Sequence, residues 1–158
     1  MAKEPKTLED LFHETLKDIY FAEKNILTAL PKMAKAAQSD ELRAAFEKHH
    51  AETEGQVKRL EQVFGLIGKK AQGKTCDAIV GIVEEGQEVM KEYKGSPALD
   101  AGLLAGAQAV EHYEISRWAG ELGLRDAVRL LDATLQEEKK TDATLTQIAE
   151  SAVNQEAA

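Results

Sequence analysis

Carboxylate and imidazole side chains stand at inward positions of several predicted helices, and both groups bind metal ions. Glu111 is the clearest case. The apolar stripe around it follows steps of four and three, the spacing of one helix face. That stripe contains Leu104, Gln108, Glu111, Ile115, Trp118 and Leu122. An ionised glutamate buried without a partner costs several kcal/mol or more, so we expect Glu111 to be matched by another group.

Three further segments place acidic or imidazole groups on inward stripes in the same way. Glu23 lies between Ile19 and Ile26 on the first stripe. The second stripe contains His49 and Gln56, with Glu52 on its shoulder, one turn after His49. The last contains Glu138 and Asp142 within the heptad Val128, Leu131, Leu135, Glu138, Asp142, Leu145 and Ala149.

Each acidic residue taken alone is better explained as a solvated side chain or a lysine partner. Together they require another explanation, because four carboxylates in one core repel each other unless protons or cations offset their charge. Two metal ions are the natural match. Bundles that hold two irons or manganeses use a Glu from each of two helices and a Glu-x-x-His from each of the others.

Four segments resemble those of the YciF-like family, bacterial stress-associated proteins of the ferritin-like superfamily. They are Tyr20–Lys24, Glu52–Val57, Val110–Ile115 and Glu137–Asp142. The resemblance extends from about Thr7 to Val153. It implies a ferritin-like four-helix bundle with an added crossover helix, a dinuclear metal motif and a homodimer.

The resemblance also implies a set of metal ligands: Glu23, His49, Glu52, Glu111, Glu114, Glu138 and Asp142. Glu23 and Glu111 would each bind an ion, and Glu52 and Glu138 would bridge the two. His49 and Asp142 would be terminal ligands, with Glu114 as a further candidate. His112 lies about 100° around the helix from Glu111, so a supporting or packing role is expected for it. Whether Gln56 contacts an ion stays open.

Two departures from the ferritin-like pattern affect this expectation. Gly55 and Thr141 occupy the positions three residues after Glu52 and Glu138, where a histidine is usual. The predicted site is therefore rich in oxygen ligands, and its metal preference is open. In addition, the third bundle helix lacks a short segment that relatives carry between Arg117 and Trp118.

Five helical segments must position these residues. We predict helices over about 7–37, 40–64, 75–93, 97–122 and 125–153, with Gly123 ending the fourth. The fold class is all-α: a ferritin-like antiparallel four-helix bundle with a long crossover between helices two and three that carries the extra short helix. Residues 1–158 form one domain with a core over about 7–153.

Composition excludes several functional classes. The net charge is -8, which argues against a nucleic-acid surface. The sequence contains one cysteine, Cys76, which cannot form an internal disulfide and so favours a reducing compartment. The first residues lack a signal-peptide pattern, and no apolar run approaches the roughly 20 residues that cross a membrane. We therefore expect a cytoplasmic protein.

The sequence thus predicts a dinuclear metal carboxylate protein of the bacterial stress response. Its expected partners are two metal ions, with iron favoured over manganese or zinc, a dioxygen or peroxide oxidant, and a second copy of the chain. Its reaction would be oxidation of ferrous iron or reduction of the oxidant, as a di-iron or di-manganese oxidoreductase. The alternative is a non-catalytic metal-binding or structural bundle that dimerises. A cage that stores mineral iron has less support.

Overall fold

The computed structural model describes residues 5–118 and 125–153, and the regular structure in these ranges is entirely helical. The helices are α1 (Leu8–Ala36), α2 (Asp40–Leu66), α3 (Asp77–Glu92), α4 (Leu99–Trp118) and α5 (Arg125–Ile148), and a π-helical turn, Ala149–Val153, extends α5. The predicted all-α class is confirmed for this part of the chain. Within the two ranges, none of the helices combines the length and apolarity that crossing a membrane requires.

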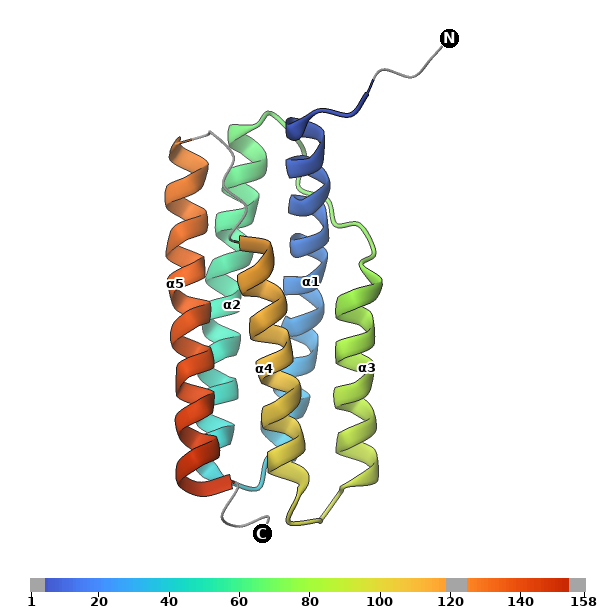
Figure 1. Cartoon of the computed structure of the whole chain (residues 1–158), viewed down its shortest axis with the longest axis vertical. Coiled ribbons are helices and arrows are strands. Elements are labelled where there is room, and N and C mark those ends of the chain that lie inside the picture. The colour runs from blue at the N-terminus through green and yellow to red at the C-terminus, as the bar shows by residue number, and fades with distance from the viewer. Residues whose placement is uncertain (1–4, 119–124, 154–158) are drawn as a thin grey trace.

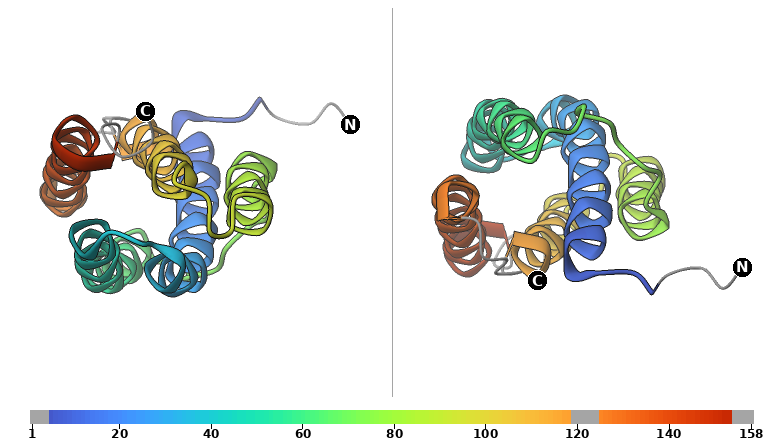
Figure 2. Two further views of the ribbon diagram at one scale, coloured as in Figure 1. Left: turned by 90° about the horizontal axis from the view of Figure 1, so that it is seen from below. Right: turned by 90° about the horizontal axis from the view of Figure 1, so that it is seen from above.

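Four long helices stand side by side, and a shorter one covers them from outside (Figure 1). The pairs α1–α2 and α4–α5 are antiparallel, and α3 runs back along the bundle between them, so α2 and α4 point the same way. Contacts join α1 to α2, α2 to α5, α5 to α4 and α4 to α1, which makes a square. Figure 2 shows α3 outside that square, against α1 and α4. The predicted crossover helix is therefore confirmed.

Local hydrogen bonds define where the first two helices begin. The backbone N–H of Asp10 donates to Thr7 Oγ1 at 3.2 Å, and Asp10 Oδ2 accepts from the Thr7 backbone N–H at 2.8 Å, a reciprocal cap at the start of α1. Ser39 caps α2 by accepting from the backbone N–H of Leu42 at 3.3 Å. These caps agree with the predicted helix starts.

Asp100, a buried residue near the start of α4, joins the two helical pairs. Its carboxylate accepts from the backbone N–H groups of Gln38 and Ser39, at 2.9 and 2.6 Å. Both donors lie in the turn between α1 and α2. Because this contact sets the height of α4 relative to α1 and α2, it also sets the level at which their side chains meet in the core.

The predicted inward stripe of α2 is buried throughout. Its members are Leu42, Phe46, His49, Thr53, Gln56, Leu60 and Val63. On α1 the stripe is confirmed from Phe12 onward, but the expectation for Leu8 was wrong, because its side chain is 63% exposed. Leu8 lies in the first turn, where Leu11 is also exposed.

The buried faces of α4 and α5 differ from the predicted stripes. On α4, Leu104 and Glu111 are buried as expected, whereas Gln108 and Ile115 are only half-buried. Residues Leu103, Ala107, Val110 and Glu114 are buried instead. The physical reason is that α4 packs against α5 on one side and against α3 and α1 on the other. A helix covered on two sides buries a wider arc than one stripe.

On α5 the buried seam shifts by one residue at three levels. Leu131, Glu138 and Leu145 are buried as predicted, while Thr134, Thr141 and Ile148 are buried in place of Leu135, Asp142 and Ala149. The predicted end of the fourth helix at Leu122 and Gly123 lies outside the described residues, as do the side chains of Trp118 and Val128.

Candidate metal centre

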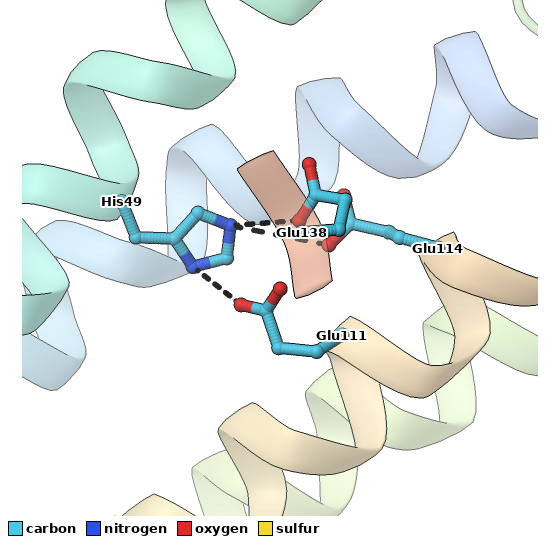
Figure 3. A group of neighbouring side chains, drawn as sticks. All are labelled: His49, Glu111, Glu114 and Glu138. Atoms are coloured by element: carbon cyan, nitrogen blue, oxygen red, sulfur yellow. Dashed lines mark ion pairs between the residues drawn. The ribbon is translucent and has the colours of Figure 1, made fainter. Parts of the chain in front are cut away.

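Four buried side chains from three helices converge at one point of the core. They are His49 of α2, Glu111 and Glu114 of α4, and Glu138 of α5. One ligand atom of each lies within 4.8 Å of the others. Figure 3 shows the imidazole of His49 facing the carboxylates of α4 and α5. We call these four residues the central cluster.

The two nitrogens of His49 face different carboxylates (Figure 3). Nδ1 lies 3.1 Å from Glu111 Oε1, while Nε2 lies 3.9 Å from Glu114 Oε2 and 3.8 Å from Glu138 Oε2. Burial lowers the pKa of His49 to about 4, and the nearby charges of Lys48 and His50 lower it further. The ring is therefore neutral at physiological pH, so one nitrogen carries a lone pair that can bind a metal.

Glu23 of α1 is a further buried carboxylate next to the central cluster. Its side chain is 0% exposed, and neither of its oxygens has a hydrogen-bond donor among the described residues. Burial raises the pKa of Glu23 well above the usual value, and the negative charge of Glu138 raises it further. The neighbouring carboxyl of Glu114 acts in the opposite direction and lowers the pKa of Glu23. Glu23 thus brings α1 into the site.

Protons are the alternative to cations in this crowded group. Burial is the main reason that the pKa of Glu111 rises to about 11 and that of Glu138 to about 7, and the pKa of Glu114 is also well above its usual value. The carboxylates also repel one another. Without a metal, several of these side chains therefore hold a proton at neutral pH.

The donor set fits a metal centre. Both oxygens of Glu23, Glu111 and Glu114, one oxygen of Glu138, and Nε2 of His49 are buried without a hydrogen-bond partner in the described structure. Buried polar atoms normally have such partners, so this concentration at one level of the core needs an explanation. Many carboxylate oxygens with one imidazole form a ligand set that suits iron or manganese.

Gln56 and Arg59 hold one side of the cluster. Gln56 Nε2 donates to Glu138 Oε1 and, at 3.4 Å, to Glu137 Oε2. The Arg59 guanidinium pairs with Glu137, and its Nε–H donates to Thr134 Oγ1 at 2.9 Å. Gln56 therefore orients Glu138, leaving Glu138 Oε2 free. Arg59 was not predicted from the sequence, although its position one turn after Gln56 could have indicated it.

Glu52 and Asp142 are not brought into the central cluster. The Glu52 side chain is 24% exposed; one oxygen lies 3.1 Å from Lys48 Nζ, and the other accepts from Thr141 Oγ1 at 3.4 Å. The Asp142 side chain is 25% exposed and lies 3.3 Å from Nε2 of the exposed His112. Both carboxylates lie at the rim of the site, and His112 faces Asp142 rather than the central cluster.

Comparison with known proteins gives a consistent result. Residues 7–158 match the family model described as Domain of unknown function (DUF892). The chain is 42% identical over 159 residues to protein YciF of Escherichia coli (strain K12), covering 96% of each protein. The crystal structure of the E. coli stress protein YciF aligns with a TM-score of 0.88, at 42% identity, over 95% of this chain and 99% of that one. YcfI of Rhodopseudomonas palustris, proposed to be a structural protein, aligns with a TM-score of 0.86, at 42% identity, over 92% and 97%.

Proposed function

The chain belongs to the DUF892 family, and we propose that it is a ferritin-like dinuclear metal protein of the bacterial stress response that oxidises ferrous iron. The topology supports the ferritin-like part of this proposal. Two antiparallel hairpins, α1–α2 and α4–α5, are joined by a crossover that carries α3. In proteins of that class, glutamates projecting inward from all four helices bind two ions. The similarity to a stress protein supports the physiological setting.

The main support is the concentration of unpaired ligand atoms at one level of the core. Glu23, Glu111, Glu114 and Glu138 are all 0% exposed. When ionised, these four carboxylates carry four negative charges, and two divalent cations carry four positive charges. The cationic side chains that the described contacts place near the site, Lys48 and Arg59, are already paired with Glu52 and Glu137. Two divalent ions would therefore neutralise the four negative charges that these cationic side chains leave uncompensated.

The residues divide naturally between two ions. His49, Glu111, Glu114 and Glu138 would hold the first, since their ligand atoms already lie together. Glu23 would hold the second, beside Glu114 and Glu138. Glu52 and Asp142 would complete the second ligand set by turning away from Lys48 and His112, their present partners.

The two ions, when bound, supply the two electrons that reduce dioxygen or peroxide as ferrous iron becomes ferric. The side chains around the ions have the remaining roles. Its glutamates release their protons as the cations bind, because a ligating carboxylate must be ionised. Gln56 holds one oxygen of Glu138 and so limits the orientation of that carboxylate. The buried position of the cluster keeps bulk water away from the reacting atoms.

Metal titration followed by oxygen uptake tests this function. Chelator-treated protein is titrated anaerobically with ferrous iron, then mixed with dioxygen while uptake and ferric absorbance are recorded. We expect two ions per chain and rapid uptake. Glu23→Gln should lower the stoichiometry and abolish rapid uptake, whereas Glu54→Gln, at an exposed position of α2, should change neither. A wild-type chain that binds no iron would contradict the proposal.

A non-catalytic bundle is the second candidate, favoured by the description of YcfI as a structural protein. The same experiment separates the two. Two bound ions without oxygen uptake indicate a metal-binding protein, and a chain that binds none is a scaffold.

A further inference from the structure

A cavity of about 30 Å³ lies between α1, α3 and α4, and His49 forms part of its wall. Its lining includes Ile26 and Met33 of α1, Ile82 and Met90 of α3, and Ala107 and Val110 of α4. Figure 2 shows the three helices that enclose this space, with α3 packed on the outside of the bundle. His49 belongs both to the wall of this cavity and to the central cluster.

The residues that line the cavity range from exposed to fully buried. Lys32 and Gln87 line the cavity and are exposed, whereas Ile26 and Ala107 are buried. His49, at the inner end, is 2% exposed. The lining of the cavity therefore includes exposed residues near α3 and a buried residue of the candidate metal centre.

The chemistry of the wall restricts what can occupy it. Between Lys32 and Gln87 at the mouth and His49 inside, the lining side chains are aliphatic, methionine or glycine. A water molecule in a cavity needs 2–4 polar partners, and apolar cavities stay dry but accept small apolar molecules. Hydrogen peroxide and hydrated cations have the same need for partners as water. Dioxygen does not need them.

The volume of the cavity also favours dioxygen. The cavity exceeds the roughly 10–15 Å³ that one water molecule requires, but it is far below the ~150 Å³ of a cavity that binds benzene. A diatomic molecule fits this range.

Two glycines create the space. A Cβ atom added at Gly86 of α3 or Gly106 of α4 would meet nothing within 4 Å, and both residues line the cavity. A glycine inside a helix costs about 1 kcal/mol relative to alanine. Helix packing requires glycine at neither position, in contrast to Gly102, where a Cβ would come within 2.7 Å of Val89 Cγ1. The residues at 86 and 106 thus keep the cavity open at some cost in helix stability.

We propose that this cavity admits dioxygen to the His49 side of the metal centre, so that dioxygen, and not peroxide, is the oxidant that enters between α1, α3 and α4. The inference rests on the proposed function, since it assigns the oxidant of the same site. Ferrous ions and peroxide, which need polar surroundings, reach the centre elsewhere.

Dioxygen can be located in the metal-free protein, independently of any reaction. Because dioxygen is paramagnetic, NMR spectra of methyl-labelled protein under dioxygen pressure report which methyl groups it approaches. We expect the largest relaxation enhancements at Ile26, Ala107 and Val110, above those of Leu42 and Leu60, which are also buried but do not line the cavity. Equal enhancement of the two groups would overturn the inference.

Filling the cavity tests its role in the reaction. Gly106→Leu and Gly86→Leu should slow oxidation of bound ferrous iron by dioxygen roughly tenfold or more, leaving iron stoichiometry and the rate with hydrogen peroxide unchanged. Gly81→Leu is the matched control, because a Cβ at Gly81 of α3 also meets nothing within 4 Å and Gly81 does not line the cavity. An unchanged dioxygen rate in both filled variants would overturn the inference.

The inference and the proposed function fail in different ways. If Gly106→Leu does not fold, Gly106→Ala, which adds a single methyl group, and the NMR measurement on wild-type protein still decide. Absence of selective enhancement overturns the inference even if iron binds and reacts. Absence of iron binding overturns the proposed function, and with it the role of the cavity, even if dioxygen enters.

Discussion

The Nδ1 atom of His49 lies 3.1 Å from Oε1 of Glu111, although these residues belong to α2 and α4, at diagonally opposite corners of the four-helix square. A contact across that diagonal passes through the bundle axis. The imidazole therefore reaches across the core from α2 to the carboxylates of α4 and α5. This relationship underlies the following predictions.

Replacing Glu111 with glutamine should stabilise the metal-free protein and weaken metal binding. The pKa of Glu111 rises to about 11, so at neutral pH the folded protein must hold a proton that the unfolded chain releases. Glutamine removes that requirement, and we expect the free energy of unfolding to rise by about 2–4 kcal/mol near pH 7.5. Urea unfolding in chelator and iron titration measure the two effects. Loss of stability in chelator would contradict the assignment.

The metal-free protein should become less stable as the pH rises from about 7 to about 9. In this window His49 is neutral in both states, because its folded pKa is about 4 and its ordinary value is 6.5. Glu111 keeps its proton only in the folded state. Each such proton lowers the free energy of unfolding by about 1.4 kcal/mol per pH unit. The iron-loaded protein should not show this decline, since bound cations hold the carboxylates ionised. A flat profile in chelator would argue against buried protonated glutamates.

Replacing His49 with glutamine should weaken iron binding by roughly tenfold or more, because an imidazole ligand is lost. His50→Gln is the matched control, since His50 is the next residue of α2 but lies outside the central cluster. Anaerobic calorimetric titration with ferrous iron compares the two variants. Equal affinities would remove His49 from the ligand set.

Glu52→Gln and Asp142→Asn should affect the second ion more than the first. Both carboxylates lie at the rim, paired with Lys48 and His112, while the central cluster is complete without them. We expect the double variant to bind about one iron per chain where the wild type binds about two. Elemental analysis of anaerobically loaded protein measures this directly. Two ions in the double variant would show that neither rim carboxylate is needed as a ligand.

Asp100→Asn should lower stability without changing the metal stoichiometry. The Asp100 carboxylate accepts backbone N–H bonds from Gln38 and Ser39, and the amide can accept only through its one oxygen. Loss of a charge-assisted bond at a buried site should cost about 1–3 kcal/mol. Thermal unfolding in chelator compares this variant with Asp132→Asn, at an exposed position of α5. An equal effect of both substitutions would show that Asp100 does not join the helical pairs.

Much of the architecture could be predicted from local pattern. The helices, their caps at Thr7 and Ser39, and the inward stripe of α2 follow from spacing and capping residues, which depend on near neighbours in the chain. The inward positions of Glu23, His49, Glu111 and Glu138 were predictable for the same reason, because each interrupts an otherwise regular apolar face.

Only the tertiary structure decided which of the remaining acidic groups reach the centre. Glu114 is fully buried and Asp142 is not, because α4 is covered on two sides and the seam of α5 turns by one residue. Spacing along one helix leaves such a rotation undetermined, since neighbouring positions can both line a seam. The cavity beside His49 likewise required α3 to be placed against α1 and α4. The sequence thus determined the helices and most of their inward positions, and the packing of helices against one another determined the exact buried arc of α4 and α5 and which side chains meet.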